Sequence, residues 1–144
     1  MKFNLMCINK DEWKEVSEAA HFNIFGVNRS ADHQRIDFCL LLQNTERNDF
    51  FGYITCREFD SKTLYWSYGG MFDQYKGTTF TFSAIWTMLN WCRERYDRVT
   101  TLVEQSNVKM QRIHLKLGAV ISGVRTFDNE IIIELTYNFS RGGN

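Results

Sequence analysis

The sequence predicts an α+β protein with a central, mostly antiparallel mixed sheet and helices covering its faces. Three strand-length segments joined by short polar turns fill residues 36–71 and predict an antiparallel meander. A buried helix of about 19 residues then leads to another strand, and it is long enough for the crossover that a parallel pair requires. The chain ends in a hairpin. Together these features predict one parallel pair within an otherwise antiparallel sheet.

The first 35 residues predict a strand, a helix and a loop. The strand covers Lys2–Ile8 and the helix Asp11–Ala20, with Asn9 or Asp11 as its N-cap. Apolar side chains recur in the helix at spacings of three and four, at Trp13, Val16 and Ala20. The segment His21–Arg35 contains Gly26, Asn28 and Ser30 and predicts a loop with at most one helical turn.

The next three strands follow from runs of apolar and aromatic residues. They cover Ile36–Gln43, Phe50–Glu58 and Thr63–Met71, and polar turns separate them. The third strand is rich in aromatic residues and ends in Gly69-Gly70. These two glycines predict added flexibility at the strand end.

The period then changes from that of strands to that of a helix over Thr78–Tyr96. The predicted buried stripe contains Phe82, Ile85, Leu89, Cys92 and Tyr96, widened by Ala84, Met88 and Trp91. Such a wide stripe is typical of a largely buried helix.

A strand over Val99–Val103 and a shorter helix over Val108–Leu117 follow. Asn107 is the predicted N-cap of this helix and Gly118 its C′ residue. The predicted inner face consists of Met110, Ile113 and Leu117.

The chain closes with a predicted hairpin over Ala119–Phe127 and Glu130–Phe139, joined at Asp128-Asn129. The second of these strands alternates apolar and polar residues. It fits two interpretations equally well, namely the edge of a monomer's sheet or a strand that pairs across a homodimer.

Composition narrows the class of protein. The 144 residues predict a single domain over 1–144, with 140–144 as a flexible tail. Apolar residues make up 44%, too many for a disordered chain, and 17 basic residues balance 17 acidic ones. This balance predicts no nucleic-acid partner. We also expect no membrane partner, because no run approaches the length of a membrane helix.

Four scattered cysteines predict reduced thiols and a cytoplasmic protein. No pair of cysteines has the short spacing that zinc sites use, so we expect no metal site.

The most informative segment lies between the aromatic-rich strand and the long helix. Its residues are Gln74-Tyr75-Lys76-Gly77-Thr78-Thr79. A helix N-terminus offers unpaired amides and a positive dipole end, which favour a phosphate group. Gly77 permits close approach of a ligand, and the threonines add hydroxyl donors. The alternative is that Gly77 only allows the turn and the threonines only cap the helix.

The order of elements and two motifs resemble the GNAT superfamily of N-acetyltransferases. The segment 74–79 is similar to its acetyl-CoA pyrophosphate loop, Q/R-x-x-G-x-G/A, with Thr79 in place of the last small residue. Asn107 followed by 112–119 resembles the second signature, an asparagine before a helix that ends in a Leu-Gly-aromatic corner. Ala119 stands where the aromatic residue is usual. The resemblance covers essentially the whole chain, and the compact chain is also similar to GNAT-like proteins of tailed phages.

The resemblance implies a GNAT-like acyl-CoA N-acyltransferase fold, in which the two parallel strands splay apart. It implies acetyl-CoA as co-substrate and an amine acceptor, either a small molecule or a protein amine. The implied cofactor-binding residues are Met71, Phe72, Gln74, Tyr75, Lys76, Gly77, Thr78, Thr79 and Asn107. In a phage-encoded protein, the cytoplasm would be that of the host.

The chemistry of the family is direct attack of a neutral amine on the thioester, which needs a base, an oxyanion donor and an acid for the thiolate. His114 stands where many members carry the tyrosine acid, so it is the candidate acid, alternatively a packed or capping residue. Glu104 is the candidate base, and Glu58 is an alternative that acts through water. A further alternative is that Ser67 or Tyr68 only positions a water molecule.

Two other functions remain open at this point. The missing tyrosine and the absence of a carboxylate from strand 63–71 fit a catalytically degenerate GNAT-like domain that binds acyl-CoA or a partner protein. Exposed aromatic residues on neighbouring strands would fit an RNA-binding sheet. The residues concerned are Phe51, Tyr53, Tyr65 and Tyr68. A monomer and a homodimer are both compatible with the sequence.

Overall fold

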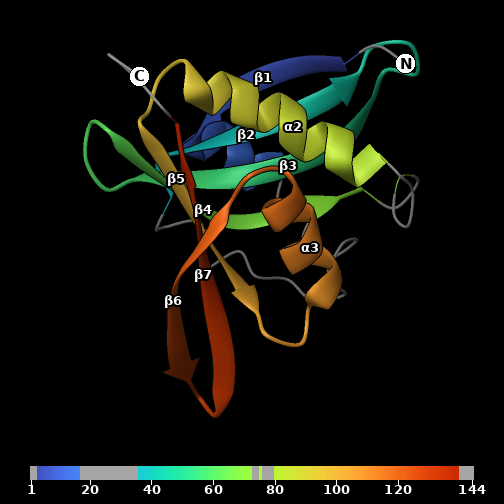
Figure 1. Ribbon diagram of the computed structural model, residues 1–144. Helices are drawn as coiled ribbons and strands as arrows, with labels where there is room; N and C mark the ends of the chain where they lie inside the picture. The colour runs from blue at the N-terminus through green and yellow to red at the C-terminus, as the bar shows by residue number, and fades with distance from the viewer. Residues whose placement is uncertain (1–2, 17–35, 73–74, 76–79, 140–144) are drawn as a thin grey trace. The chain divides into compact units, whose positions relative to one another are not determined.

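The computed structural model describes residues 3–16, 36–72, 75 and 80–139. These residues form two compact units, the first from Met1–Arg57 and Ser67–Met88, the second from Glu58–Trp66 and Leu89–Asn144. The strands hydrogen-bond in the order β1-β2-β3-β4-β5-β7-β6 (Figure 1). Strand β4, Thr63–Met71, contributes to both units. Strands β4 and β5 pair in parallel, whereas β1–β2, β2–β3, β5–β7 and β6–β7 pair antiparallel, which confirms the predicted mixed sheet.

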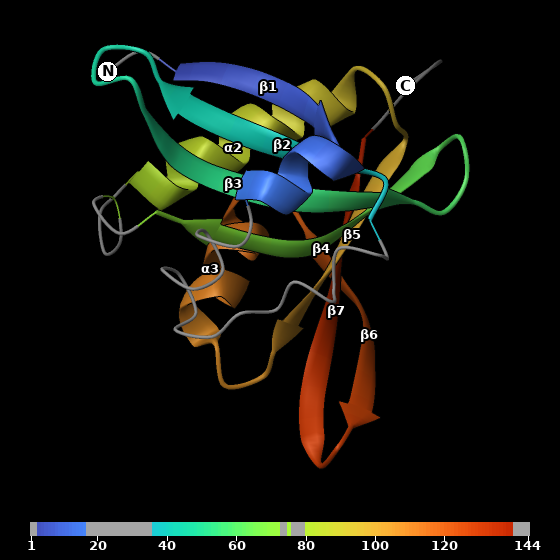
Figure 2. The same ribbon diagram turned by 180° about the vertical axis from the view of Figure 1, so that it is seen from behind.

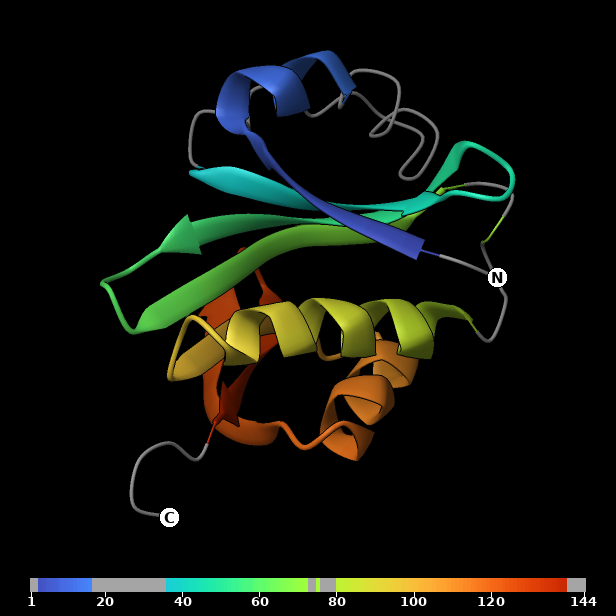
Figure 3. The same ribbon diagram turned by 90° about the horizontal axis from the view of Figure 1, so that it is seen from above.

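The first unit contains strands β1 (Phe3–Asn9), β2 (Phe38–Asn44), β3 (Asp49–Glu58) and the end of β4. The helical residues 10–16 cover one face of these strands (Figure 2), and the beginning of α2 (Phe80–Arg93) covers the opposite face (Figure 3). Trp13 of this helical segment packs in a buried cluster with residues of the strands and of the loop before β2. The cluster consists of Ile8, Trp13, Ile36, Cys39, Leu41 and Tyr53.

The second unit contains β5 (Arg98–Glu104), α3 (Val108–Lys116), β6 (Val120–Phe127) and β7 (Glu130–Asn138). Strand β7 lies between β5 and β6. The predicted turn joins β6 to β7, and Asp128 and Asn129 adopt φ values of 49° and 65°. Positive φ at both central residues is the geometry of a two-residue hairpin turn whose twist matches that of the strands.

The position of β7 corrects one prediction. Because β5 and β6 occupy both of its edges, β7 is neither an edge of the sheet nor able to pair across a dimer. Burial explains most of its alternating apolar residues instead, since Ile133, Leu135 and Tyr137 are buried, whereas Ile131 beside the turn is 41% exposed.

Most of the predicted buried stripe of α2 is confirmed, since Ala84, Ile85, Met88, Leu89 and Cys92 are buried. The helix ends at Arg93, so Tyr96 is buried beyond it rather than within it. Trp91 is only half-buried, and Phe82 is 37% exposed. At 100° per residue, Phe82 lies roughly 90° from the centre of the stripe. It therefore lies at the margin of the buried face rather than within it.

The glycines at the end of β4 permit close packing rather than flexibility. A Cβ atom added at Gly69 would lie 3.2 Å from Cγ1 of Ile54, and one added at Gly52 would lie 3.1 Å from the carbonyl oxygen of Gly70. A side chain at either position would therefore require neighbouring atoms of β3 or β4 to shift by a few tenths of an ångström, so these glycines allow the close approach of the two strands.

Two further findings concern the membrane-protein and RNA-binding classes that the sequence analysis considered. None of the described helices is long and apolar enough to cross a membrane. Phe51 and Tyr53, two of the four rings considered for base stacking, are 0% and 1% exposed. Rings enclosed to this degree cannot stack on the bases of an RNA.

The first helix begins with a reciprocal capping interaction. The amide of Glu12 donates to Oδ1 of Asn9 at 2.8 Å, and the amide of Asn9 donates to Oε1 of Glu12 at 3.2 Å. Of the two predicted N-caps, the structure thus selects Asn9. Such a capping box satisfies two amides that the helix itself leaves unpaired.

We expect Asn9→Ala to lower the free energy of unfolding by about 1 kcal/mol, because the substitution removes the side-chain oxygen that accepts from the Glu12 amide. Urea denaturation followed by circular dichroism measures the change. Asn9→Asp keeps an acceptor at the cap and should remain within a few tenths of a kcal/mol of the wild type. Equal destabilisation by both substitutions would contradict the capping role.

Candidate active site

The parallel ladder between β4 and β5 is short. It joins Thr63–Trp66 to Arg98–Thr101 and stops there, although β4 continues to Met71 and β5 to Glu104. At the last pair, the Thr101 hydroxyl donates to the carbonyl oxygen of Trp66 at 3.3 Å. A side-chain hydroxyl thus occupies the backbone acceptor at the point where the pairing of the strands ends.

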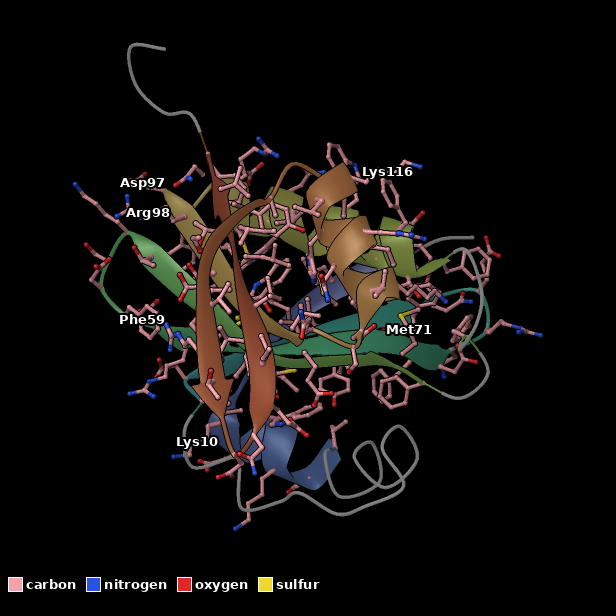
Figure 4. All side chains as sticks on the ribbon, turned by 60° about the horizontal axis from the view of Figure 1, so that its bottom comes forward. Lys10, Phe59, Met71, Asp97, Arg98 and Lys116 are labelled. Carbon is pink, nitrogen blue, oxygen red and sulfur yellow. The ribbon has the colours of Figure 1, made fainter. Side chains whose placement is uncertain are left out.

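The end of β4 carries two of the predicted cofactor-binding residues, Met71 (Figure 4) and Phe72. The amide of Phe72 donates to the carbonyl oxygen of Phe51 at 3.1 Å, and its own carbonyl accepts from the amide of Tyr75 at 2.8 Å. The ring of Phe72 packs near Phe50 and Tyr53. Both backbone groups of Phe72 are therefore engaged inside the first unit.

Tyr75 anchors the predicted pyrophosphate segment to strands β2 and β3. Its side chain is 2% exposed, and its hydroxyl accepts from Nδ2 of Asn44 and donates to Oδ1 of Asp49, both at 2.7 Å. Its ring packs against those of Phe51 and Phe80. The other members of this segment, Gln74, Lys76, Gly77, Thr78 and Thr79, lie outside the described residues.

The turn from β5 to α3 places Glu104 and Asn107. Oδ1 of Asn107 accepts from the amide of Met110 at 3.2 Å, which confirms Asn107 as the N-cap. Nε2 of Gln111 donates to the carbonyl oxygens of Glu104 and Gln105, at 3.0 and 2.7 Å. These bonds hold the backbone of the turn, while the Glu104 side chain is exposed at the end of β5.

Two of the three alternatives to Glu104 have hydrogen-bond partners of their own. Oε1 of Glu58 accepts from the Tyr96 hydroxyl at 2.5 Å. The Ser67 hydroxyl lies 2.9 Å from Oγ1 of Thr55 and 3.2 Å from the Thr55 carbonyl oxygen. The side chain of Tyr68, the third alternative, lies outside the described part of the structure. Glu58 and Glu104 are both exposed, but the Glu58 carboxylate is engaged by Tyr96.

His114 is the one side chain of α3 that is buried, at 4% exposed. Its Nδ1 lies 2.6 Å from the hydroxyl of Tyr137 on β7, and the two rings meet edge to face with centroids 5.7 Å apart. Burial lowers the pKa of His114 from 6.5 to about 4, and it raises the pKa of Tyr137. Both groups are therefore neutral at pH 7, so His114 does not supply the imidazolium acid expected from the sequence.

The residues that follow α3 hold the backbone of His114 in place. Gly118 follows the helix with φ of 109°, as predicted for a C′ residue, and the amide of Ala119 donates to the His114 carbonyl oxygen at 3.0 Å. The predicted inner-face residues Met110, Ile113 and Leu117 are only half-buried. The face of α3 that is enclosed is therefore centred on His114.

Trp66 lies beside this pair. Its ring centroid is 6.1 Å from that of Tyr137, and the side chain is 3% exposed. Its indole Nε1 is enclosed and has no hydrogen-bond partner among the described residues. An enclosed donor without a partner costs free energy, so it marks a place where the fold is not optimised for stability alone.

The sequence analysis missed Tyr137 and Trp66 as members of this cluster. Tyr137 is 23 residues from His114 and belongs to another element, so no local motif joins them. The available signal was the alternation along β7, which shows that Tyr137 shares a face with Leu135 but not which helix covers that face. In the part of the chain that the structure describes, no three His, Cys, Asp or Glu side chains gather as metal ligands would.

The described fold is similar to solved N-acetyltransferase structures. The ribosomal-protein-S18-alanine N-acetyltransferase of Escherichia coli is 9% identical with a TM-score of 0.80, over 99% of this chain and 97% of that one. The spermidine/spermine N-acetyltransferase of Vibrio cholerae is 9% identical with a TM-score of 0.73, over 95% and 92%. A GNAT-family acetyltransferase of Bacillus cereus is 13% identical with a TM-score of 0.72, over 98% and 100%.

No family model matches the sequence, and no curated protein matches it. At identities near 10%, the likeness concerns the fold. The chain therefore has the GNAT fold that the sequence predicted, with a mixed sheet and one parallel pair.

We expect His114 to make the stability of the protein depend on pH. Its pKa is about 4 in the folded chain and near 6.5 when unfolded, so between these values the unfolded chain binds the additional proton. The free energy of unfolding should therefore fall as the pH drops from about 6.5 to about 4, by up to about 3 kcal/mol. Urea denaturation across this range measures the slope. His114→Gln does not titrate at this position and should flatten the slope, and an unchanged slope would contradict the assignment.

We expect Tyr75→Phe to lower the free energy of unfolding by about 1–3 kcal/mol, because the buried Asn44 and the half-buried Asp49 lose the hydroxyl that they share. A double-mutant cycle with Asp49→Ala isolates the bond between the Tyr75 hydroxyl and the carboxylate. The two substitutions should be clearly non-additive. Additive effects would mean that this bond does not hold the segment.

Proposed function

We propose that the chain is an N-acetyltransferase that moves an acetyl group from acetyl-CoA to a primary amine. The observation that carries the proposal is the fold, with its parallel β4–β5 pair joined by α2 and an asparagine-capped helix after β5. Proteins with this fold include enzymes named for the N-acetylation of an alanine of a ribosomal protein and of spermidine or spermine. The acceptor of this chain is accordingly proposed as a primary amine of a small molecule or a protein.

The residues proposed to bind the cofactor are those that the resemblance implies: Met71, Phe72 and residues 74–79 of the first unit, and Asn107 of the second. Backbone amides of residues 76–79, before the N-terminus of α2, are assigned to the diphosphate of acetyl-CoA. Met71 and Phe72 are assigned to the pantetheine arm, and Tyr75 to the anchoring of the segment. Oδ1 of Asn107 accepts a hydrogen bond in the helix cap, so the side-chain NH₂ group (Nδ2) is the group assigned to the cofactor.

The proposed reaction is a direct transfer. The neutral amine attacks the thioester carbon, a nitrogen–carbon bond forms, and the carbon–sulfur bond breaks with its electron pair on sulfur. Glu104, as an exposed carboxylate at the end of β5, is the proposed acceptor of the amine proton. His114 is proposed to lie near the leaving sulfur because it occupies the position of the tyrosine acid in the resemblance.

A cytoplasmic location fits this proposal. None of the four cysteines forms a disulfide, and Cys39, Cys56 and Cys92 are buried. Burial raises the pKa of Cys39, which leaves its thiol protonated and unreactive. Cysteines without disulfides are typical of proteins in a reducing compartment such as the cytoplasm.

Isothermal titration calorimetry with acetyl-CoA tests the cofactor site. We expect the wild type to bind, Gly77→Ala to bind more weakly, and Gly77→Trp not to bind, since a large side chain would fill the space assigned to the diphosphate. Equal affinity of the wild type and Gly77→Trp, or no binding by the wild type, would remove the proposed site.

Thiol release from acetyl-CoA over a panel of primary amines then separates the two functions left open. Turnover by the wild type that falls at least tenfold in Glu104→Gln supports the transferase. Binding of acetyl-CoA without thiol release for any amine would support a degenerate acyl-CoA-binding domain instead.

A further inference from the structure

The direction of the hydrogen bond between His114 and Tyr137 follows from counting protons. At neutral pH the imidazole carries one N–H and the phenol one O–H, and the two side chains share one bond of 2.6 Å. If Nδ1 donated this bond, the Tyr137 proton would need another acceptor. None lies within reach of the Tyr137 hydroxyl among the described residues, and Tyr137 is 3% exposed.

A buried hydroxyl without an acceptor is costly, whereas donation to Nδ1 satisfies it. The bond therefore runs from the Tyr137 hydroxyl to Nδ1 of His114, and the proton of the imidazole is placed on Nε2. This Nε2 atom has no hydrogen-bond partner among the described residues. The described side-chain atoms that are both fully enclosed and unpartnered do not include it, so Nε2 keeps some exposure to solvent. Nε2–H is thus a neutral donor at the accessible side of an otherwise enclosed ring.

We propose that Tyr137 is a positioning residue that fixes His114 as a neutral Nε2–H donor to the sulfur of the leaving thiolate. The inference rests on the proposed function and adds to it a residue that neither sequence motif contains. A donor of this kind stabilises developing negative charge without giving up its proton. The edge-to-face contact of the two rings and the bond from Ala119 to the His114 backbone keep the donor in one orientation.

The proton balance agrees with this role. A proton transfer from Nε2–H to sulfur would leave an imidazolate or draw the proton from Tyr137, and both anions would be buried. Sulfur therefore leaves as a thiolate that accepts a hydrogen bond from Nε2–H, and it takes its proton from water after release. The amine proton goes separately to Glu104, so His114 is neutral before and after the reaction.

The tautomer is tested on the free protein by nitrogen-15 NMR of the histidine side chains. We expect His114 to be protonated at Nε2 and not at Nδ1, with no titration between pH 5.5 and 8. Tyr137→Phe should give a mixture of both tautomers. Protonation at Nδ1 in the wild type, or a tautomer unchanged in Tyr137→Phe, would overturn the inference whether or not the protein is an enzyme.

The proposed role of Tyr137 and His114 in the reaction is tested by steady-state kinetics with acetyl-CoA. Tyr137→Phe should lower kcat about tenfold and His114→Ala about a hundredfold, with KM for acetyl-CoA nearly unchanged, because the donor acts on charge that develops only during the reaction. His114→Gln supplies a neutral amide donor and should recover part of the loss. Tyr96→Phe, which also removes a buried hydroxyl from the second unit, is the matched control and should keep kcat.

The outcomes separate this inference from the proposed function. Wild-type turnover with an unchanged kcat in Tyr137→Phe would overturn the positioning role and leave the transferase intact. A wild type that neither binds nor cleaves acetyl-CoA would overturn the transferase and with it the role at sulfur, while the NMR result would still decide the tautomer. A loss of kcat equal to that in Tyr96→Phe would show a merely structural effect and contradict the inference.

Discussion

The parallel pairing of β4 with β5 is the constraint on which the rest of the structure depends. Two strands that run in the same direction need a crossover, and α2 supplies it. The helix must therefore bury a continuous stripe, as Ala84, Met88 and Leu89 show. In the sequence, the residues proposed to bind the cofactor begin at the last residue of β4 or follow β4 and β5.

Sequence periodicity predicted the elements well because each depends on neighbours in the chain. The Asp128-Asn129 turn follows from residues that tolerate positive φ, and the Asn107 cap from a side chain that reaches its own helix. The failures are of another kind. The exposure of Phe82 and the interior position of β7 depend on what packs against each element, and a local pattern contains no information about that.

The candidate site also combines residues that local sequence patterns identify with partners that only the tertiary fold brings to them. His114 was found from its spacing to Gly118, but the hydroxyl that bonds to it comes from 23 residues away. Likewise, Tyr75 was found in a loop motif, whereas its partners Asp49 and Asn44 are 26 and 31 residues distant. Sequence reasoning therefore identified candidate residues, and the tertiary fold shows the groups to which they bond and which affect their protonation and orientation.

Burial resolves the apparent departure of this chain from the pattern that it resembles. An exposed histidine in place of a tyrosine would exchange a neutral hydroxyl donor for a cation at slightly acidic pH. Enclosed in the second unit, with burial holding its pKa at about 4, His114 stays neutral and presents a single N–H, as a phenol presents a single O–H. The proposed donor thus has the same charge and the same number of donated protons as the tyrosine of the resemblance, with Tyr137 bonded to the second ring nitrogen.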